Sequence, residues 1–429
     1  MRIIHNFKQA NKALSQFVSL DRRKPYTLDR MERLMDLFDN PQNKLKIIHV
    51  AGTSGKSSTS YYMASLLKNA GNSVGLTVSP HINEINERVQ INLLPLSEND
   101  YCVELSNFLD KVNNSGINPS YFEVLVAFAF WLFRKKNVDY AVVEVGLGGL
   151  LDGTNVIDRN DKVCVITDIG LDHVEILGRT VSKIAIQKAG IIQKGNEVFM
   201  HQQDQSIMDS IKKICLEKKA NFHECHFLKK KVGFLTLLPL FQQRNFSLAM
   251  QAVDFVLNRD NKNGLKDKEI KNASKTIIPG RMEQIQYKGD KIILDGAHNE
   301  QKIYALVASI KQKFPNKTIT VLISFGDNKR NSTLGGLRLL RQLGDKIIIT
   351  SFSKGQDEIR MPIDVHILAA EAKKVGFKNI VVEANAKRAL ELLSVSKTTI
   401  KLVTGSFYLL SQIKQDLARY SRTIQIAEH

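Results

Sequence analysis

The chain has 429 residues, of which 43% are hydrophobic and 24% are charged. This composition is ordinary for a globular protein and excludes a disordered or fibrous class, and the length predicts two domains, or three. Lysine and arginine number 61 against 43 acidic residues, so the net charge of +18 would attract polyanions. The basic residues are spread along the whole chain without an RNA-recognition motif, which favours a generally basic surface over nucleic-acid binding.

The sequence carries no export or membrane signal. Residues 1–6 lack the apolar stretch and the small-residue cleavage site of a signal peptide. The longest apolar stretch, Phe122 to Phe133, is shorter than the roughly 20 residues that a membrane span needs and predicts a buried helix. The four cysteines form no Cys-x-x-Cys pair and are typical of reduced thiols. We therefore expect a cytoplasmic protein with no membrane segment.

The segment from His49 to Thr59 has the pattern of a phosphate-binding loop. It reads His-Val-Ala-Gly-Thr-Ser-Gly-Lys-Ser-Ser-Thr and follows a strand predicted over residues 45–50. A glycine turn that leads into a helix N-terminus directs backbone N–H groups at one point, which suits a phosphate. Lys56 adds a cation, and a hydroxyl of Ser57 or Ser58 suits the neighbourhood of a metal ion. The loop therefore indicates ATP binding.

The loop departs from the standard Walker A pattern, which requires glycine at the position of Val50. The shorter pattern Gly52-x-x-Gly55-Lys56 remains. A strand-to-helix turn with a surface lysine is the alternative interpretation. The helix that follows is predicted over residues 57–70 and ends at Gly71, a typical C-terminal stop.

Two further strands lead to chemically active side chains. The strand predicted over 138–145 carries Glu144 near its end, and the strand predicted over 162–167 is followed by Asp172 and His173. Because the carboxyl ends of parallel strands meet at one edge of a sheet, Glu144 and His173 should lie beside the phosphate loop. A lone histidine is more often structural, but this position favours a functional role. Glu144 is the predicted Mg²⁺ ligand.

A helix predicted over 182–192 and a strand predicted over 197–201 continue the alternation. The segment His223-Glu-Cys-His226 lacks the helical histidine spacing of a zinc protease and has no second group of ligands nearby. A metal site there is not favoured.

The second half of the chain repeats the alternation after a polar, lysine-rich segment that ends at Lys275. Strands are predicted over residues 291–295, 318–325, 346–352, 379–383 and 397–404, with a closing helix over 406–418. We place a domain boundary near residue 278. The predicted fold is thus α/β, with a parallel-sheet, phosphate-loop domain over residues 1–278 and a smaller Rossmann-like domain over 279–429. The second domain has no Gly-x-Gly-x-x-Gly motif, so its fold alone does not make it a dinucleotide binder.

Motifs along nearly the whole chain resemble the folylpolyglutamate synthases and dihydrofolate synthases, which are members of the Mur ligase superfamily. The family's loop G-T-N-G-K-G-S looks like Gly52-Thr-Ser-Gly-Lys-Ser-Ser58. The other similar segments, in the correct order, are Ser79-Pro80-His81 with Glu87-Arg88, Glu144 to Asn155, Ile169 to Thr180, Lys188 to Ile191, Phe241 to Asn245, Pro279 to Arg281, Asp295 to Asn299 and Gly405 to Leu409. Such a series is far more specific than any one motif.

The resemblance implies that ATP binds between the two domains, consistent with domain closure during turnover. Asn245 would contact the adenine, and Arg281 and Asp295 would contact the nucleotide from the second domain. The implied contacts of ATP in the loop are Thr53, Ser54, Gly55, Lys56, Ser57 and Ser58.

The resemblance also implies one Mg²⁺ ion, or two. Ser79, Glu144 and His173 would hold the first, a donor set that Mg²⁺ accepts although imidazole is less usual. Lys188 would be carbamylated by CO₂ and help to hold the second. The alternative for Lys188 is a surface lysine that faces solvent, but the apolar neighbours Ile184, Ala185 and Ala189 indicate a half-buried helix. The implied catalytic residues are Lys56, His173 and Lys188.

The implied activity is ADP-forming amide ligation. A carboxylate attacks the γ-phosphate of ATP, an acyl phosphate forms, and an amine then displaces phosphate. In the family the amine is L-glutamate, and the acid is dihydropteroate or the γ-carboxylate of a folate. His298 and Ser406 are the candidate glutamate contacts, Tyr121 and Phe122 the candidate pterin contacts. We expect a monomer.

Four departures from the family motifs leave the substrate open. The loop asparagine is Ser54, the arginine of G-G-R-L-D is Leu150, and the acid before K-A-G is Gln187. The family's later D-K-D element is replaced by Gly326-Asp-Asn-Lys-Arg330. A ligase of the same superfamily for another acid and amino acid therefore remains an alternative, and neither the choice between the two folate activities nor the glutamate chain length follows from the sequence. A third hypothesis is a nucleotide-dependent binding protein, with RNA as its candidate ligand. Ser79, Glu144, His173 and Lys188 argue against it, because a nucleotide switch needs no carboxyl-activating site.

Overall fold

The computed structural model describes residues 3–18, 27–227, 233–327, 330–353 and 361–427. The chain forms two compact units. The first unit comprises Met1–Leu238 and Gln242–Thr276, and the second comprises Pro239–Phe241 and Ile277–His429.

The first unit is built on an eight-stranded sheet with the order β4-β3-β2-β5-β1-β6-β7-β8. Its strands are β1 (Ile47–Ala51), β2 (Val74–Thr77), β3 (Val89–Ile91), β4 (Leu94–Pro95), β5 (Tyr140–Glu144), β6 (Val163–Ile166), β7 (Glu197–His201) and β8 (Asn221–Cys225). Six neighbouring strands, from β2 to β8, are parallel, whereas β3 and β4 pair antiparallel at one edge. The predicted parallel α/β sheet is confirmed, with an antiparallel edge added.

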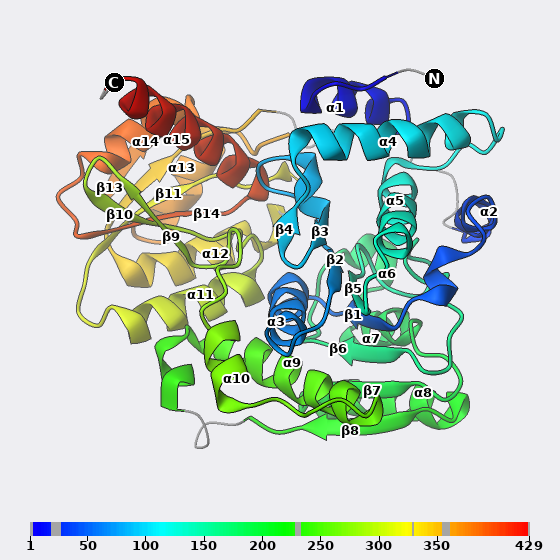
Figure 1. Cartoon of the computed structure of the whole chain (residues 1–429). Helices are drawn as coiled ribbons and strands as arrows, with labels where there is room; N and C mark the ends of the chain where they lie inside the picture. The colour runs from blue at the N-terminus through cyan, green and yellow to red at the C-terminus, as the bar shows by residue number, and fades with distance from the viewer. Residues whose placement is uncertain (1–2, 19–26, 228–232, 328–329, 354–360, 428–429) are drawn as a thin grey trace. The chain divides into compact units, whose positions relative to one another are not determined.

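Helices cover both faces of this sheet (Figure 1). They are α1 (Phe7–Ser15), α2 (Asp29–Asp36), α3 (Lys56–Asn69), α4 (Glu98–Asn113), α5 (Tyr121–Lys135), α6 (Val174–Leu177), α7 (Val181–Ala189), α8 (Gln205–Lys218), α9 (Leu240–Arg259) and α10 (Asp267–Ala273). Short 3-10 turns occupy Pro41–Lys44, Ile85–Arg88 and Gly233–Leu237. One face of the sheet packs on α5, α7 and α8, and the other on α3 with α9 and α10 beside it.

Helix α5 is the buried helix that the apolar stretch predicted. Ser120 and Glu123 form a reciprocal capping box at its N-terminus, and eleven of its residues are buried. Arg30 binds the Glu123 carboxylate at 3.3 Å, which offsets the cost of burying that charge. No helix in the described ranges is both long and apolar enough to cross a bilayer.

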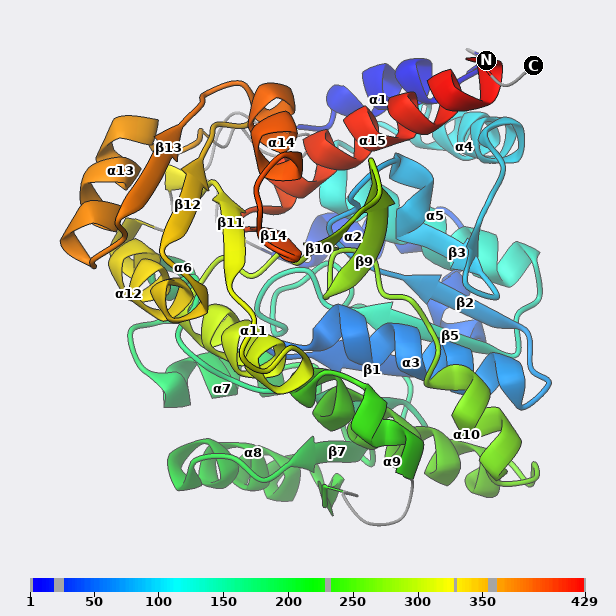
Figure 2. The same cartoon turned by 90° about the vertical axis from the view of Figure 1, so that its left-hand side faces the viewer.

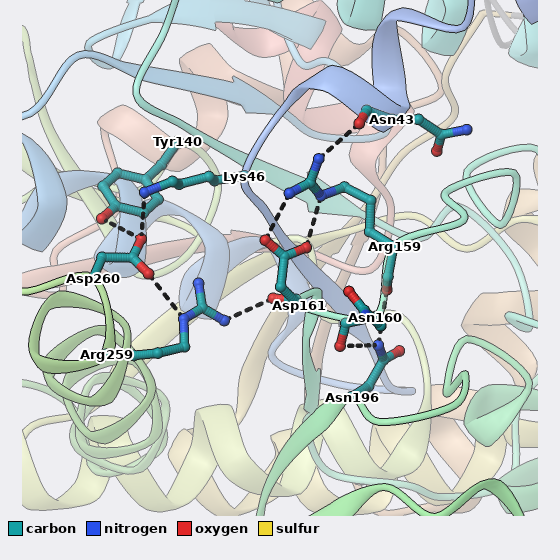
Figure 3. Close-up of polar contacts among 9 residues, drawn as sticks. All are labelled: Asn43, Lys46, Tyr140, Arg159, Asn160, Asp161, Asn196, Arg259 and Asp260. Carbon is teal, nitrogen blue, oxygen red and sulfur yellow. Dashed lines mark hydrogen bonds and ion pairs between the residues drawn. The ribbon is translucent and has the colours of Figure 1, made fainter.

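A polar network fastens the amino ends of the parallel strands to the end of α9 (Figure 3). The Asp260 carboxylate accepts hydrogen bonds from Lys46 at 3.0 Å, Tyr140 at 2.8 Å and Arg259 at 2.9 Å. Arg259 also donates to the backbone oxygen of Asp161 at 2.6 Å. Burial alone would raise the pKa of Asp260, but the three donors outweigh it and lower the pKa to about 2. The network lies at the amino ends of β1, β5 and β6, on the side of the sheet opposite to the carboxyl ends of these strands.

The second unit has a six-stranded sheet with the order β13-β12-β11-β14-β10-β9. Its strands are β9 (Glu283–Tyr287), β10 (Asp290–Leu294), β11 (Ile319–Ile323), β12 (Lys346–Ile349), β13 (Asn379–Val382) and β14 (Ile400–Thr404). Its helices are α11 (Glu300–Lys313), α12 (Arg330–Leu340), α13 (Val365–Lys374), α14 (Ala386–Ser394) and α15 (Phe407–Ala427), with a 3-10 turn at Arg341–Leu343. As Figure 2 shows, α11 and α12 lie on one side of the strands and α14 and α15 on the other. The five predicted strands are present, and the antiparallel edge strand β9 was not predicted.

Candidate active site

The site lies at the carboxyl edge of the first sheet. Strands β2, β5, β1 and β6 are adjacent and parallel, so their carboxyl ends meet at this edge. The predicted loop follows β1, and Glu144 is the last residue of β5. Ser79 lies beyond β2, and His173 lies beyond β6 at the residue before α6.

The phosphate loop is fixed to the end of β6 by its own backbone. The N–H groups of Thr53 and Ser54 both donate to the Asp168 carbonyl oxygen, at 2.9 and 3.1 Å. Gly55 precedes α3 with a φ of 91°, a conformation that favours glycine. The first-turn N–H groups of Lys56, Ser57 and Ser58 have no acceptor within the helix, because the first turn of any helix lacks one. These three groups, rather than those of Thr53 and Ser54, are available for a phosphate.

Asn245 of α9 lies against the loop. A β-carbon at Gly55 would overlap the Asn245 side-chain oxygen, so the absence of a side chain there permits the contact. Arg244, the preceding residue, binds Asp168 with its Nε at 2.9 and 3.1 Å from the two carboxylate oxygens. The start of α9 is thus attached to the loop, although the adenine contact assigned to Asn245 stays a prediction.

Two lysines converge on one backbone oxygen. Lys56 Nζ lies 3.2 Å and Lys188 Nζ 2.8 Å from the Gly52 carbonyl oxygen. Lys188 is only 4% exposed, so the alternative interpretation of a lysine facing solvent is wrong. The end of α7 therefore brings a second cationic side chain to the phosphate loop.

Glu144 joins the loop to the segment after β2. Its Oε1 accepts a hydrogen bond from the Ser57 hydroxyl at 2.8 Å, and its Oε2 accepts one from the Ser79 N–H at 3.2 Å. The side chain is buried, with the residue 4% exposed. The structure thus brings together Ser57, Ser79 and Glu144 as predicted. His173 has a φ of 49°, and its partly exposed ring lies 4.0 Å from the Asp172 carboxylate.

A small pocket opens beside Glu144. Its lining residues are Thr77, Val78, Ser79, Arg88, Phe122, Leu125, Val126 and Glu144. Phe122 is therefore next to the predicted metal ligands. The ring of Tyr121 lies 5.6 Å below the Arg88 guanidinium. Both predicted pterin contacts are thus grouped near Arg88.

Arg88 lines the pocket although no sequence pattern predicted it as a site residue. It is 3% exposed and donates from Nε to His81 Nδ1 at 2.9 Å. A buried guanidinium in a pocket is a ready partner for a carboxylate. The available signal was its place in the motif segment Glu87-Arg88, but hydrophobic periodicity does not mark a buried arginine.

The second unit carries its own group of predicted residues at the carboxyl ends of β10 and β14. Asp295 accepts hydrogen bonds from the N–H groups of Met282 and Ala297, both at 2.9 Å. Burial raises the pKa of Asp295 to about 6 against the opposing charge of Arg281. Arg281 stacks over the Phe407 ring at 4.5 Å. Ser406, the residue before Phe407, accepts a hydrogen bond from the Tyr408 N–H at 3.1 Å.

His298 lies in the same group and is held by a lysine that the sequence analysis also missed. His298 Nδ1 lies 2.7 Å from the Gly296 carbonyl oxygen, and Nε2 lies 3.0 Å from Lys302 Nζ. Since the carbonyl can only accept, Nδ1 carries the hydrogen and Nε2 accepts from the lysine. Arg281, His298 and Lys302 give this end of the second sheet a basic character.

The comparisons with known proteins assign the family. Residues 280–417 match the model "Dihydrofolate synthetase, C-terminal domain", and residues 50–235 match the "Mur ligase middle domain". Dihydrofolate synthetase of Saccharomyces cerevisiae is 30% identical over 418 residues, which cover 90% of this chain and 96% of that protein. The chain belongs to the dihydrofolate synthase and folylpolyglutamate synthase family.

Another family member and a solved structure agree. The dihydrofolate synthase/folylpolyglutamate synthase of Bacillus subtilis is 29% identical over 421 residues, 91% of this chain and 94% of that protein. The structure of Mycobacterium tuberculosis folylpolyglutamate synthase complexed with ADP superposes with a TM-score of 0.82 at 25% identity, covering 95% of this chain and 97% of that one. The predicted family, α/β fold and enzyme class, an ATP-dependent ligase, are confirmed.

Proposed function

We propose that this protein joins L-glutamate to the carboxylate of dihydropteroate with conversion of ATP to ADP and phosphate, and that folates are its second class of acid. The observation that carries the proposal is the convergence of Lys56, Lys188, Glu144 and Ser79 at the carboxyl edge of one sheet. A helix N-terminus with a lysine suits phosphates, and an adjacent pocket with Arg88 and Phe122 suits an aromatic acid.

The order of the two acids rests on the relatives. The two relatives that align along about nine-tenths of this chain are named for dihydrofolate synthesis, alone or together with folylpolyglutamate synthesis. A relative named for folylpolyglutamate synthesis alone, from Arabidopsis thaliana, aligns over 70% of the chain.

The chemistry follows from the groups at the edge. The carboxylate oxygen of the acid attacks the γ-phosphorus of ATP, the bond to the β-γ bridging oxygen breaks, and ADP leaves. Lys56 and the first-turn N–H groups of α3 stabilise the charge on the transferred phosphoryl group. The glutamate nitrogen then attacks the acyl carbon, a proton is lost from the nitrogen, and phosphate leaves as the amide forms.

The residues present fit a Mg²⁺ ion. Glu144 offers a buried carboxylate that accepts hydrogen bonds from the Ser57 hydroxyl and the Ser79 N–H. Carboxylate and hydroxyl oxygens are ligands that Mg²⁺ prefers. We propose that Glu144, Ser79 and His173 hold it, and its chemistry there would be to neutralise phosphate charge. Among the described residues no three His, Cys, Asp or Glu side chains are grouped so that they could hold a metal ion, so a site here depends on the serine oxygens.

We also propose that Lys188 is carbamylated and helps to hold a second ion. In the unmodified state two ammonium groups share the Gly52 oxygen, which places like charges close together. A carbamate would replace one of those charges by an anion and remove the repulsion. In the second unit, we propose that Arg281 and Asp295 contact the nucleotide and that His298 and Ser406 contact glutamate.

The deciding experiment supplies purified protein with Mg²⁺, ATP and L-glutamate, and with dihydropteroate or tetrahydrofolate in turn. We expect ADP release that depends on the acid, and a product heavier by one glutamate in the mass spectrum. ATP hydrolysis without a glutamate product, in protein that binds ATP, would exclude both folate activities. It would support the ligase for another acid that Leu150 and Gln187 left open.

A further inference from the structure

A chain of buried polar groups connects β1 to the turn after β5. His49 Nε2 lies 2.8 Å from Thr154 Oγ1, and the Thr154 hydroxyl donates to Asp152 Oδ1 at 2.5 Å. Asp152 Oδ2 accepts a hydrogen bond from the Leu147 N–H at 2.7 Å. His49 and Thr154 are fully buried, and Asp152 is 5% exposed. None of these groups has a part in the phosphoryl or glutamyl transfer described above.

The direction of the hydrogen bonds defines the state of His49. Asp152 Oδ1 also accepts from the Thr154 N–H at 3.0 Å, so every one of these bonds runs toward a carboxylate oxygen. Burial raises the pKa of Asp152, and the bonds donated by Leu147 and Thr154 oppose that effect. The single hydrogen of the Thr154 hydroxyl is donated to Asp152. His49 Nε2 must therefore donate to the Thr154 hydroxyl oxygen. The other ring nitrogen, Nδ1, is buried and has no hydrogen-bond partner within the described ranges. His49 is therefore a fixed donor through Nε2.

Electrostatics agrees with this assignment. Burial, with a smaller effect from the charge of Lys162, lowers the pKa of His49 well below its ordinary value. Burial therefore favours the neutral form of the His49 imidazole.

The turn at residues 149–152 packs against the end of α7, where Gln187 and Lys188 lie. The Leu150 N–H donates to the Gln187 carbonyl oxygen at 2.8 Å. A β-carbon at Gly149 would lie 2.7 and 2.8 Å from the carbonyl oxygens of Gln187 and Lys188, so the two backbones touch. Lys188 Nζ in turn reaches Gly52, three residues beyond His49 on the same strand and loop. These contacts connect β1 to the turn after β5, the turn to the end of α7, and α7 back to the phosphate loop that follows β1.

We propose that His49 and Thr154 are positioning residues, which act through Asp152 to hold residues 146–155 against the end of α7, the helix that carries Lys188 to the phosphate loop. The kinetic consequence rests on the proposed function, whereas the structural consequence does not. Neither residue contacts a reacting atom, so substitution changes kcat through geometry, since small displacements of reacting groups are costly.

The test is Thr154→Val, which replaces the Thr154 hydroxyl by a methyl group and keeps the shape of the side chain. In Thr154→Val we expect faster amide hydrogen exchange in peptides spanning 146–155 and a kcat lower by about tenfold, with the KM for ATP within about twofold of wild type. Thr154→Ser should restore both exchange and kcat, because it keeps the hydroxyl. Thr320→Val, which removes another fully buried threonine hydroxyl in β11, should leave exchange over 146–155 unchanged.

His49→Gln supplies the second arm. Its kcat should fall while its pH–rate profile stays parallel to that of wild type, because burial favours the neutral form of His49. Loss of a limb of the profile would overturn the fixed-donor assignment. Unchanged exchange over 146–155 in Thr154→Val, or a lower melting temperature with unchanged kcat, would overturn the positioning role. If wild type itself forms no glutamate product, the proposed function fails and the exchange comparison still decides the positioning of the turn.

Discussion

Lys56 is the residue whose loss should be most damaging to turnover. Its ammonium is at the phosphate loop, 3.2 Å from the Gly52 oxygen, at the N-terminus of a helix. In Lys56→Ala we expect ADP release to fall by about a hundredfold or more, because the charge that develops on the phosphoryl group loses a cation at the loop. The measurement is coupled ADP release with saturating acid. Lys68→Ala, an exposed lysine in the last turn of the same helix, is the matched control and should behave as wild type. Retained turnover in Lys56→Ala would remove the loop from the mechanism.

His173 tests the metal assignment. The backbone of this residue adopts a left-handed conformation at the start of α6, which fixes the ring at the end of the β6 loop. We expect His173→Ala to need a much higher Mg²⁺ concentration for half-maximal rate, by about tenfold or more, since a lost ligand weakens the site. The rate is titrated against Mg²⁺ at fixed ATP. His226→Ala, from the segment in which no metal site is favoured, should titrate like wild type. An unchanged Mg²⁺ requirement in His173→Ala would contradict the assignment of His173 as a metal ligand.

At the scale of elements, the contact between the turn after β5 and the end of α7 is a tight one. Gly149→Ala would place a β-carbon within 2.8 Å of two backbone oxygens, and backbone cannot give way as a flexible side chain can. We expect α7 to shift, with a lower kcat and a loss of stability of about 1–3 kcal/mol, the usual range for overpacking. Gly153→Ala is the control in the same turn, because its nearest neighbours would be side chains at 3.5 Å. Both variants are compared by thermal unfolding and by ADP release. Equal behaviour of the two would contradict the tight contact.

The elements that the sequence predicted share one property. Strands β1, β5, β6 and β7 are short apolar runs buried on both faces, which is the pattern that a parallel sheet imposes. Among the strands that escaped prediction, β2 is buried throughout but spans only four residues, and the edge strands lack the apolar pattern. β9 reads Glu-Gln-Ile-Gln-Tyr at a sheet edge, and β4 spans two residues. Edge strands gain little from burial, so their sequences carry little hydrophobic signal.

At the scale of the whole molecule, the sequence could place Lys56 and Glu144 at one edge because parallel strands end together. It could not place Lys188 on Gly52, since a half-buried helix does not reveal which group its lysine reaches. The burial of Arg88 and Asp152 could not be predicted from the sequence either. A polar residue in a loop has the same sequence pattern whether its side chain is solvated or buried. The amino-edge network of Asp260 is assembled from segments more than 100 residues apart, and no local pattern predicts it.

The Asp260 network makes the free energy of unfolding fall as the solution becomes acidic. Asp260 has a folded pKa of about 2 against an ordinary 3.8, so its ionised form is favoured by folding. The resulting stability, about 2 kcal/mol, is present above pH 4 and is lost as the pH falls through the folded value. In Asp260→Asn we expect a lower melting temperature than wild type at pH 7 and a difference that shrinks toward pH 2. Glu217→Gln, whose side chain is 57% exposed beside Lys213, should match wild type at every pH. A difference for Asp260→Asn that persists unchanged from pH 7 to pH 2 would show that the carboxylate charge contributes nothing. Its effect would then come from packing and hydrogen bonding alone.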